Sequence, residues 1–273
     1  MKPVLVQTLG RTGSTLLMNL LKHIDGLYVA GEYPFEERII TYLYRLGNLP
    51  FIRSNSISSN LWNHESTLGP CPLMGPYLGR FDYFNKNENL DSLFKSIWEG
   101  FCQSKEFSGF KYYAEKNPSS TSPEISRILD AKNIFLIRDP KDQILSIRNF
   151  DKKRGYLGFG KGSEATLDGI QSICNSWKYL FSIYEKMNKE SIVIKYEDLI
   201  LNRELELEKI GQYLGGKINI DNFLKENQGY VEKHSTSKSD KDSIGQWKTG
   251  LTEAEIEHIN KELKAFNSYF DYQ

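Results

Sequence analysis

Long apolar runs are absent from this sequence of 273 residues. No stretch approaches the ~20 consecutive apolar residues that a membrane-spanning helix needs, which excludes a helical membrane protein. The first strand-like run starts at Pro3 and leaves no room for a secretory signal peptide. We therefore expect no membrane span and, if the sequence is the whole natural chain, a cytoplasmic location.

Cysteine and histidine are scarce. The three cysteines, Cys71, Cys102 and Cys174, are an odd number and show no C-x-x-C spacing. This favours free thiols in a reducing compartment over a disulfide framework. The four histidines are scattered along the chain, so no group of them has the spacing of metal ligands. We expect no metal site.

An excess of charge of one sign is also lacking. Lysine plus arginine and aspartate plus glutamate each total 35, which gives a formal net charge of zero. Such a balance provides no global basic field for nucleic acid or for an anionic membrane. Nucleic acid is therefore not an expected partner, and any anion site must be local.

Short strand-like and helix-like segments alternate along the chain. Apolar runs with the character of buried strands lie at residues 4–7, 27–30, 109–113, 133–137 and 192–196. Helical patterns lie at residues 14–24, 35–46, 90–104, 122–129, 140–149, 165–187, 203–214 and 254–266, the last preceded by Thr252 and Glu255 at capping-box spacing. This alternation is typical of right-handed βαβ units. We predict an α/β fold: one domain, residues 1–273, with a central parallel sheet of about five strands flanked by helices.

Three segments have loop character. Residues 47–89 carry Ser-Asn and Gly-Pro clusters, residues 151–163 are rich in Lys, Arg and Gly, and residues 229–250 are polar around Trp247. Loops of this length inside one domain are usually functional lids or disordered. We expect the first two to be insertions beside a substrate.

The segment TLGRTGSTLL, residues 8–17, follows the first strand-like run directly. Unpaired N–H groups at a helix N-terminus carry partial positive charge, so a glycine-containing turn with hydroxyls and one cation suits a phosphate. A kinase loop places Lys directly after its second glycine, whereas here Ser14 follows Gly13 and the cation is Arg11. The pattern therefore predicts a phosphate site without the triphosphate-reading lysine; an ordinary strand-to-helix turn is the alternative.

A second cation follows another strand-like run. Arg138 comes directly after residues 133–137, and Pro140 suits the first turn of the next helix. Ligands of open α/β sheets bind outside the carboxyl ends of the strands. We therefore expect Arg11 and Arg138 to face one crevice, with the Ser146 hydroxyl available to the ligand that Arg138 holds.

These motifs, taken in order, resemble those of the sulfotransferases that use 3′-phosphoadenosine 5′-phosphosulfate (PAPS). Residues 8–17 look like the family's 5′-phosphosulfate loop, residues 135–150 like its 3′-phosphate segment, and residues 195–199 (KYEDL) like its Tyr-Glu-Asp-Leu strand end. Residues 243–248 (SIGQWK) resemble its C-terminal Gly-x-Trp-Lys loop. Within the family, the chain resembles the bacterial and the tyrosylprotein or carbohydrate type more than the small-phenol type. Gly31-Glu32 follows the second strand-like run, and the sequence shows no catalytic-type Lys-x-His motif.

The resemblance implies a nucleotide-kinase-like fold with the phosphate-binding loop after the first strand, and PAPS as donor without a metal. The implied nucleotide contacts come from Arg11, Thr12, Gly13, Ser14, Thr15, Arg138, Ser146, Tyr196, Ser243, Trp247 and Lys248. The implied catalytic residues are Glu32 as general base, Arg11 at the leaving phosphate and Lys116 at the transferred sulfonate. Four of these residues have a structural alternative. Glu32 could be a surface carboxylate, Lys116 a solvated lysine, Tyr196 a core residue, and Trp247 part of a solvated linker.

The chemistry agrees with these residue types. A transferred sulfuryl group carries one negative charge, less than a terminal phosphoryl group, so side-chain cations can replace the magnesium of kinases. Transfer also requires an acceptor hydroxyl or amine in line with the leaving group and a base that takes up the proton of the acceptor.

Two other functions stay open. A nucleoside-triphosphate-dependent small-molecule kinase would use Asp139, after the fourth run, to hold magnesium. A non-catalytic binding module would keep the nucleotide and transfer nothing.

We expect residues 35–89 and 151–163 to line the pocket that binds the acceptor. Their many aromatic residues favour a small natural product or a glycolipid as the acceptor. A polysaccharide is less favoured, because residues 152–154 form the one basic cluster. If an N-terminal anchor was removed from the chain, the resemblance implies the Golgi lumen.

Overall fold

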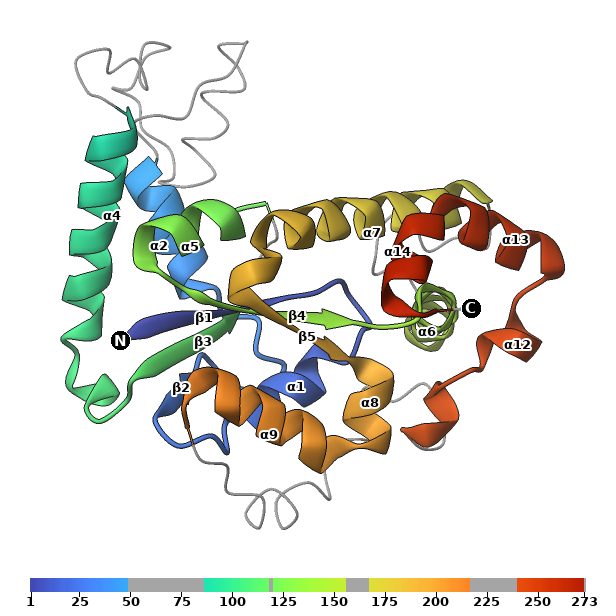
Figure 1. The fold of residues 1–273 in the computed structure, drawn as a ribbon, viewed down its shortest axis with the longest axis horizontal. Coiled ribbons are helices and arrows are strands. Elements are labelled where there is room, and N and C mark those ends of the chain that lie inside the picture. The colour runs from blue at the N-terminus through green and yellow to red at the C-terminus, as the bar shows by residue number, and fades with distance from the viewer. Residues whose placement is uncertain (49–85, 118–119, 156–166, 217–239, 273) are drawn as a thin grey trace.

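The computed structural model describes residues 1–48, 86–117, 120–155, 167–216 and 240–272. Five parallel strands form one sheet in the order β2-β3-β1-β4-β5 (Figure 1). Their bounds are β1 Lys2–Gln7, β2 Leu27–Val29, β3 Tyr112–Lys116, β4 Lys132–Ile137 and β5 Ser191–Lys195. The predicted α/β fold with a five-stranded parallel sheet is confirmed.

Helices connect the strands and continue after the sheet. The α-helices are α1 Ser14–Leu21, α2 Ile39–Asn48, α4 Lys86–Cys102, α5 Ser122–Leu129, α6 Pro140–Arg154, α7 Leu167–Met187, α8 Tyr196–Leu201, α9 Arg203–Leu214, α12 Trp247–Gly250, α13 Glu253–Glu262 and α14 Lys264–Phe270. Short 3₁₀ turns are η2 Lys105–Phe107, η4 Asn188–Glu190 and η5 Lys241–Ser243. The predicted capping box opens α13, where the Thr252 hydroxyl accepts the Glu255 N–H and the Glu255 carboxylate accepts the Thr252 N–H.

Several predicted bounds were wrong. β3 is Tyr112–Lys116 rather than 109–113, because two charged residues at its end are buried by partners that lie far away in the sequence. Tyr196 begins α8 and does not end β5. α6 continues to Arg154, so the first residues of the predicted loop 151–163 are helical and the rest lie outside the described residues.

The C-terminal helical prediction also needs correction. The single helix expected over residues 254–266 is two helices, α13 and α14, separated at Leu263. Leu263 leaves the helical conformation with φ −108° and ψ 23°. The break turns α14 back toward α7, where Phe266 and Phe270 are buried.

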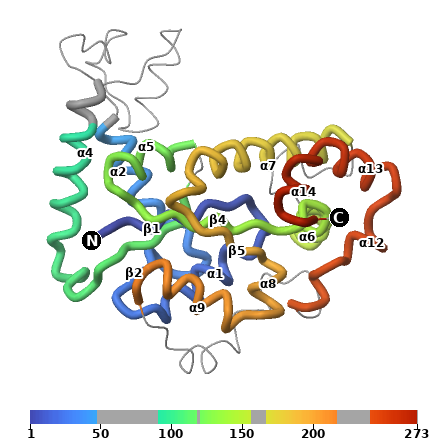
Figure 2. The backbone as a smooth tube through the Cα atoms, viewed as in Figure 1, coloured from blue at the N-terminus to red at the C-terminus, as the bar shows by residue number. Residues whose placement is uncertain are grey.

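Alternating residues of the strands divide the core between the two faces of the sheet. Val4 and Val6 of β1 pack with α1 and α9 on one face, whereas Leu5 packs with α2, α4 and α5 on the other. Figure 1 shows α1 and α9 below the sheet and α2, α5 and α7 above it, and the tube in Figure 2 shows the same arrangement. A third cluster joins β4 to α6, α7, α13 and α14. With both faces covered, the carboxyl ends of β1, β3 and β4 are the places where polar side chains can meet a ligand.

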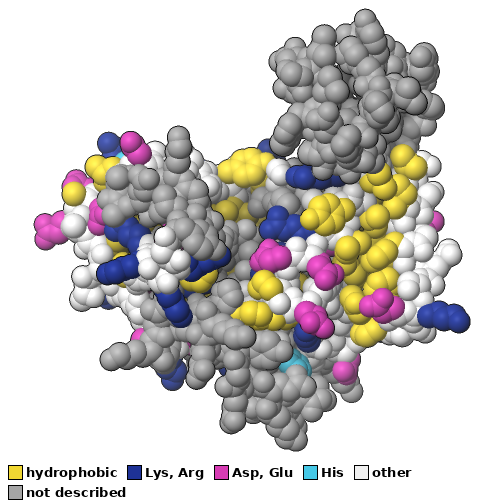
Figure 3. All heavy atoms as spheres, turned by 180° about the vertical axis from the view of Figure 1, so that it is seen from behind, with side chains coloured by type: hydrophobic (Ala, Val, Ile, Leu, Met, Phe, Trp, Pro, Cys, Tyr) yellow, Lys and Arg dark blue, Asp and Glu magenta, His cyan; other side chains and the backbone are white. Residues whose placement is uncertain are grey.

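The described surface carries charges of both signs. Figure 3, drawn from the side opposite to Figure 1, shows Lys and Arg together with Asp and Glu side chains across the same face. Within the described ranges, none of the helices combines the length and the apolar composition that crossing a bilayer requires. Cys102 and Cys174 are free thiols, and Cys71 lies outside the described residues.

Glu115 at the end of β3 couples the fold to pH. Its carboxylate is fully buried and accepts the N–H groups of Ile40 at 2.8 Å and Thr41 at 3.2 Å, which caps the start of α2. Burial raises its pKa to about 7, although those hydrogen bonds oppose the rise. A pKa above that of the unfolded chain means that the native state binds the extra proton between the two pKa values. Glu115 therefore favours folding most at low pH, and this contribution is lost as the pH rises through about 7.

Glu115→Gln is expected to flatten this part of the pH dependence. From pH 5 to pH 8 the wild type should lose about 2 kcal/mol of unfolding free energy relative to the variant, since each unit of pKa difference corresponds to about 1.4 kcal/mol. Urea unfolding at several pH values measures the difference. Glu99→Gln, which changes an exposed carboxylate on α4, is the control and should parallel the wild type. Parallel curves for wild type and Glu115→Gln would contradict the assignment.

Candidate active site

The turn between β1 and α1, residues 8–13 (the phosphate loop), has an unusual backbone. Arg11 has φ 64° and Gly13 has φ 90°, both in the left-handed region. Thr12 is buried, and its hydroxyl bonds to that of Thr8 and donates to the Leu9 carbonyl at 2.8 Å. A Cβ on Gly13 would collide with the ring of Tyr196. Glycine is therefore required at position 13 by both its φ and its neighbour.

Two buried side chains hold the phosphate loop from α6 and α7. Gln143 donates from Nε2 to the Gly10 carbonyl at 2.7 Å, and its Oε1 accepts the indole N–H of Trp177 at 2.7 Å. Both side chains are almost completely buried. The sequence analysis missed this support: it singled out only Arg138 and Ser146 as nucleotide contacts within residues 135–150, and Trp177 belongs to no phosphate motif.

Arg138 at the carboxyl end of β4 lies directly against the phosphate loop. Its Nη1 donates to the Arg11 carbonyl at 2.9 Å, and its Nη2 donates to the Ser243 carbonyl at 2.7 Å. The guanidinium carbon lies 4.4 Å from the centre of the Tyr196 ring. Its Nε is buried and has no hydrogen-bond partner among the described residues. A buried donor of this kind suits an anionic ligand.

The side chain of Arg11 completes what we call the arginine cluster: Arg11, Arg138, Ser146, Tyr196 and Ser243. Arg11 donates from Nε to the Ser146 hydroxyl at 3.3 Å, and the Tyr196 and Ser243 hydroxyls lie 2.8 Å apart. Burial, and then the charge of Arg138, lower the pKa of Arg11 to about 10. The charge of Asp151 opposes this change in part. Two partly desolvated cations side by side are stabilised further by an anion.

The C-terminal segment is tied to α6 beside this cluster. The Asp142 carboxylate accepts the Gly245 N–H at 2.6 Å and the Trp247 N–H at 3.0 Å. The Trp247 ring lies 4.8 Å from the Lys141 Nζ, whereas Lys248 is exposed. Asp142 is a positioning residue that the sequence analysis did not single out.

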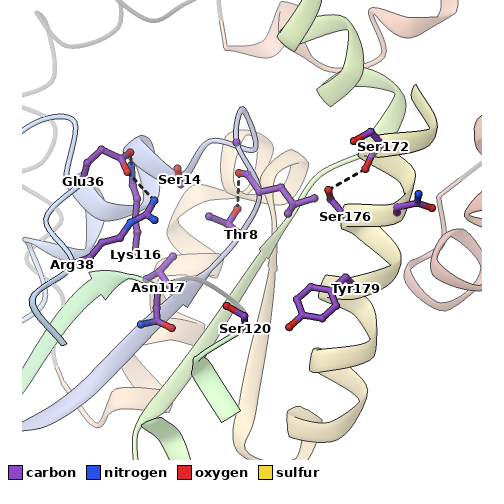
Figure 4. Close-up of a pocket in the computed structure, with 14 residues that line it drawn as sticks. Thr8, Ser14, Glu36, Arg38, Lys116, Asn117, Ser120, Ser172, Ser176 and Tyr179 are labelled. Carbon is purple, nitrogen blue, oxygen red and sulfur yellow. Dashed lines mark hydrogen bonds and ion pairs between the residues drawn. The ribbon is translucent and has the colours of Figure 1, made fainter. Parts of the chain in front are cut away.

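Residues of the phosphate loop also line a cavity of about 760 Å³. Figure 4 shows Glu36, Arg38 and Lys116 at one side of it and Ser172, Ser176 and Tyr179 of α7 at the other. The wall between them includes Thr8, Leu9, Gly10, Ser14, Asn117 and Ser120. The cavity and the arginine cluster therefore meet at the phosphate loop.

Lys116 is the most buried cation of the cavity. Its Nζ donates to the Pro34 carbonyl at 2.7 Å and to Glu36 Oε1 at 2.8 Å, and reaches the Thr15 hydroxyl at 3.5 Å. Burial lowers the pKa of Lys116, and Glu36 opposes this change. The contact with Thr15 places the ammonium group at the start of α1.

Glu32, predicted as the base, is exposed and is not among the residues that line the cavity. Glu36 lines it instead, with a half-exposed carboxylate between Lys116 and Arg38. Which carboxylate faces the cavity depends on the path of the chain from β2 to α2. No local sequence signal distinguishes the two.

Asp139, which a kinase would use to hold magnesium, caps α6. One of its carboxylate oxygens accepts the Lys141 N–H at 2.9 Å and lies 3.3 Å from the Lys141 ammonium group. Its own N–H donates to Glu197, which also accepts the Tyr272 hydroxyl. These contacts assign Asp139 a structural task at the end of β4.

A sequence model described as the sulfotransferase family matches residues 3–219, which include the phosphate loop, Lys116, Arg138 and Tyr196. The chain belongs to the sulfotransferase family. The resemblance inferred from the motifs is thereby confirmed. A comparison with curated proteins gives no significant match.

Solved sulfotransferases have the same fold. The sulfotransferase domain from the curacin biosynthetic pathway is 15% identical with a TM-score of 0.55, covering 96% of this chain and 97% of that one. Mouse sulfotransferase SULT7A1, solved with PAP, is 13% identical with a TM-score of 0.52, covering 96% and 85%. Sulfotransferase STF9 from Mycobacterium avium is 13% identical with a TM-score of 0.52, covering 100% and 77%. At sequence identities this low, the comparisons show a shared fold and nothing about the reaction.

Most of the predicted site residues of this sulfotransferase lie around its phosphate loop. One set of contacts joins Arg11, Gly13, Arg138, Ser146, Tyr196 and Ser243. A second set comprises Lys116, which reaches Thr15 and lines the cavity together with Ser14. Thr12 is turned inward and shapes the loop. In the described part of the chain, no group of three or more His, Cys, Asp or Glu side chains could hold a metal ion.

Proposed function

We propose that this protein transfers the sulfuryl group of PAPS to a hydroxyl group of a small organic or glycolipid acceptor. The observation that carries the proposal is the arginine cluster: the Arg138 guanidinium at the end of β4 donates to the carbonyl of Arg11 in the phosphate loop, and its charge lowers the pKa of the Arg11 side chain. PAP, the product nucleotide, has phosphates at both its 3′ and 5′ ends. Two cations at one crevice match that pair of anions.

The residues divide the nucleotide between them. Arg138, with Ser146, would hold the 3′-phosphate, and the phosphate loop with the start of α1 would hold the 5′-phosphate. The Tyr196 ring would lie against the nucleotide between them. Trp247, docked on α6, would cover this side, with Lys248 at its edge. Arg11 would neutralise the charge that develops on the bridging oxygen.

Transfer would be in line and would need no metal ion. The acceptor oxygen forms a bond to sulfur while the bond between sulfur and the bridging oxygen breaks, and the electron pair of that bond leaves with PAP. Lys116 would balance charge on the sulfuryl oxygens. The proton of the acceptor hydroxyl passes to a carboxylate of the protein.

Two carboxylates are candidates for this base: Glu32, predicted from the sequence, and Glu36. We favour Glu36, because its carboxylate lines the cavity and lies 2.8 Å from the Lys116 ammonium group. A group that touches the sulfonate-binding lysine is close to the point of transfer. Glu32 is not among the residues that line the cavity.

Nucleotide binding tests the proposal. By isothermal titration calorimetry in EDTA, PAP should bind at least about tenfold more tightly than ATP, since only PAP places an anion at both cations. Added magnesium should leave PAP binding unchanged. With ³⁵S-labelled PAPS and pooled hydroxylated acceptors, labelled sulfate ester should form.

The rival functions give different results. A preference for ATP that depends on magnesium would support the kinase and overturn the proposal. Tight PAP binding with no label transferred to any acceptor pool would support a binding module.

A further inference from the structure

The side of the cavity formed by α7 carries a polar face. Ser172, Asn175, Ser176 and Tyr179 all line the cavity, and they follow one another at intervals of three or one residues on the helix. This spacing puts the four side chains on one face. In Figure 4 Ser176 and Tyr179 project from α7 toward the side where Thr8 and Ser120 lie. We call these four residues the α7 polar face.

The chemistry of this face differs from that of an ordinary solvated helix surface. The four residues are neutral, with three hydroxyls and one amide, whereas charged residues such as Lys178, Glu185 and Lys186 occupy other exposed positions of α7. The opposite side of the helix is core, with Trp177 fully buried. Tyr179 is 49% exposed and presents both a ring and a hydroxyl to the cavity. Neutral donors and acceptors beside one aromatic ring suit a ligand rich in hydroxyl groups.

The charges of the cavity also favour a neutral ligand. Its two lysine or arginine side chains, Lys116 and Arg38, both pair with Glu36, at 2.8 Å and 3.3 Å. Within the described cavity wall these three groups leave one net positive charge, which the sulfuryl group of the donor would offset. A polyanionic glycan or an acidic peptide would need further cations here.

We propose, resting on the sulfuryl transfer proposed above, that the α7 polar face binds the acceptor and that the acceptor is a neutral sugar or a similar polyol. The hydroxyls of the sugar exchange hydrogen bonds with Ser172, Asn175 and Ser176, and its ring lies against Tyr179. One hydroxyl then points across the cavity toward Ser14 and Lys116. The predicted acceptor segments are residues 35–89 and 151–163, of which 49–85 and 156–163 lie outside the described residues, and α7 is a further acceptor element that the sequence analysis did not foresee.

Kinetics with neutral glycosides test this role. The probes are the octyl β-glycosides of glucose, galactose and mannose, compared with 2-naphthol and with a Glu-Tyr copolymer, each with ³⁵S-labelled PAPS. We expect at least one glycoside to be the best acceptor. Ser176→Ala should raise the KM for that glycoside about fivefold, and Tyr179→Ala should raise it about tenfold or more. The kcat should change less than about twofold in both variants, since each substitution removes contacts that the acceptor already makes in the ground-state complex.

Ser182→Ala is the matched control. Its hydroxyl also bonds to a backbone carbonyl of α7, that of Tyr179, as the Ser176 hydroxyl bonds to that of Ser172, but Ser182 does not line the cavity. Its KM should equal that of the wild type. The affinity for PAP should stay the same in all three variants.

The outcomes separate this inference from the proposed function. Better sulfation of 2-naphthol or the copolymer than of any glycoside, or an unchanged KM in both cavity variants, would overturn the inference while sulfuryl transfer stands. If no glycoside is sulfated, and none binds the PAP complex in saturation-transfer NMR, the inference also fails. If PAP itself does not bind, the proposed function fails with it.

Discussion

Glu36→Gln is expected to lower kcat by about 10² to 10⁴-fold, the usual effect of removing a general base. Glutamine keeps the size and the hydrogen-bonding oxygen of the side chain but cannot take up the proton of the acceptor. Its oxygen can still accept from Lys116, which also keeps its bond to the Pro34 carbonyl. The affinity for PAP should therefore change less than about twofold, and the loss should lie in kcat.

Glu32→Gln is the matched control for this prediction. It makes the same chemical change four residues earlier, at an exposed position outside the cavity lining. Single-turnover rates with ³⁵S-labelled PAPS compare the two variants at the chemical step. A large loss in Glu32→Gln together with a near-normal Glu36→Gln would return the base to the residue predicted from the sequence. Equal small losses in both would remove the carboxylate base from the proposal.

Arg138→Ala is expected to weaken PAP binding by about 100-fold or more. The variant loses charge-assisted hydrogen bonds to a phosphate in a buried setting, each of which contributes about 1.5–3 kcal/mol. It also releases the Arg11 and Ser243 carbonyls, which Arg138 now joins. Arg138→Lys should give an intermediate affinity, because lysine keeps the charge but lacks the planar fork that holds two partners at once.

Arg127→Ala provides the control for Arg138→Ala. Arg127 is a half-exposed arginine on α5 that pairs with Asp91, far in sequence from the phosphate loop. Calorimetry should show unchanged PAP affinity in this variant, and thermal unfolding should show that both alanine variants are folded. Folded Arg138→Ala protein that binds PAP as tightly as the wild type would remove the 3′-phosphate assignment.

The phosphate loop and Arg138 could be predicted because their signals are local. Each motif follows a short apolar strand within a few residues, and parallel strands bring their carboxyl ends to the same edge of a sheet. Ser146 lies on α6, which begins two residues after Arg138, so the short link and the helical geometry fix its position relative to Arg138. For these residues, the spacing along the sequence is therefore enough to predict most of their relative positions in the fold.

β3 shows where local reasoning failed. Its last two residues, Glu115 and Lys116, are charged, and a strand pattern based on apolar residues ends before them. In the structure both are buried, because the N–H groups at the start of α2 bind Glu115 and the Pro34 carbonyl and Glu36 bind Lys116. Those partners lie about 75 to 80 residues away in the sequence. Burial of a charge depends on such partners, which no local window contains.

The acceptor side shows the same limit. The sequence analysis assigned it to residues 35–89 and 151–163; Glu36 and Arg38 of the first segment do line the described cavity, and one face of α7 lines it as well. A neutral polar stripe on a long helix looks like a solvated surface until the helix is packed opposite the phosphate loop. Similarly, Gln143 and Asp142 became support for the site only when α6 placed them under Gly10 and beside Trp247.

The sequence by itself determined the parallel α/β sheet, the glycine-containing turn after β1 and the membership of the sulfotransferase family. Hydrophobic periodicity, a glycine-containing turn and cations at strand ends are properties of short segments, so they can be recognised without coordinates. Only the tertiary structure decided which carboxylate meets Lys116, what holds the phosphate loop and which helix faces the cavity. These depend on distances between segments far apart in the chain, and packing alone sets such distances.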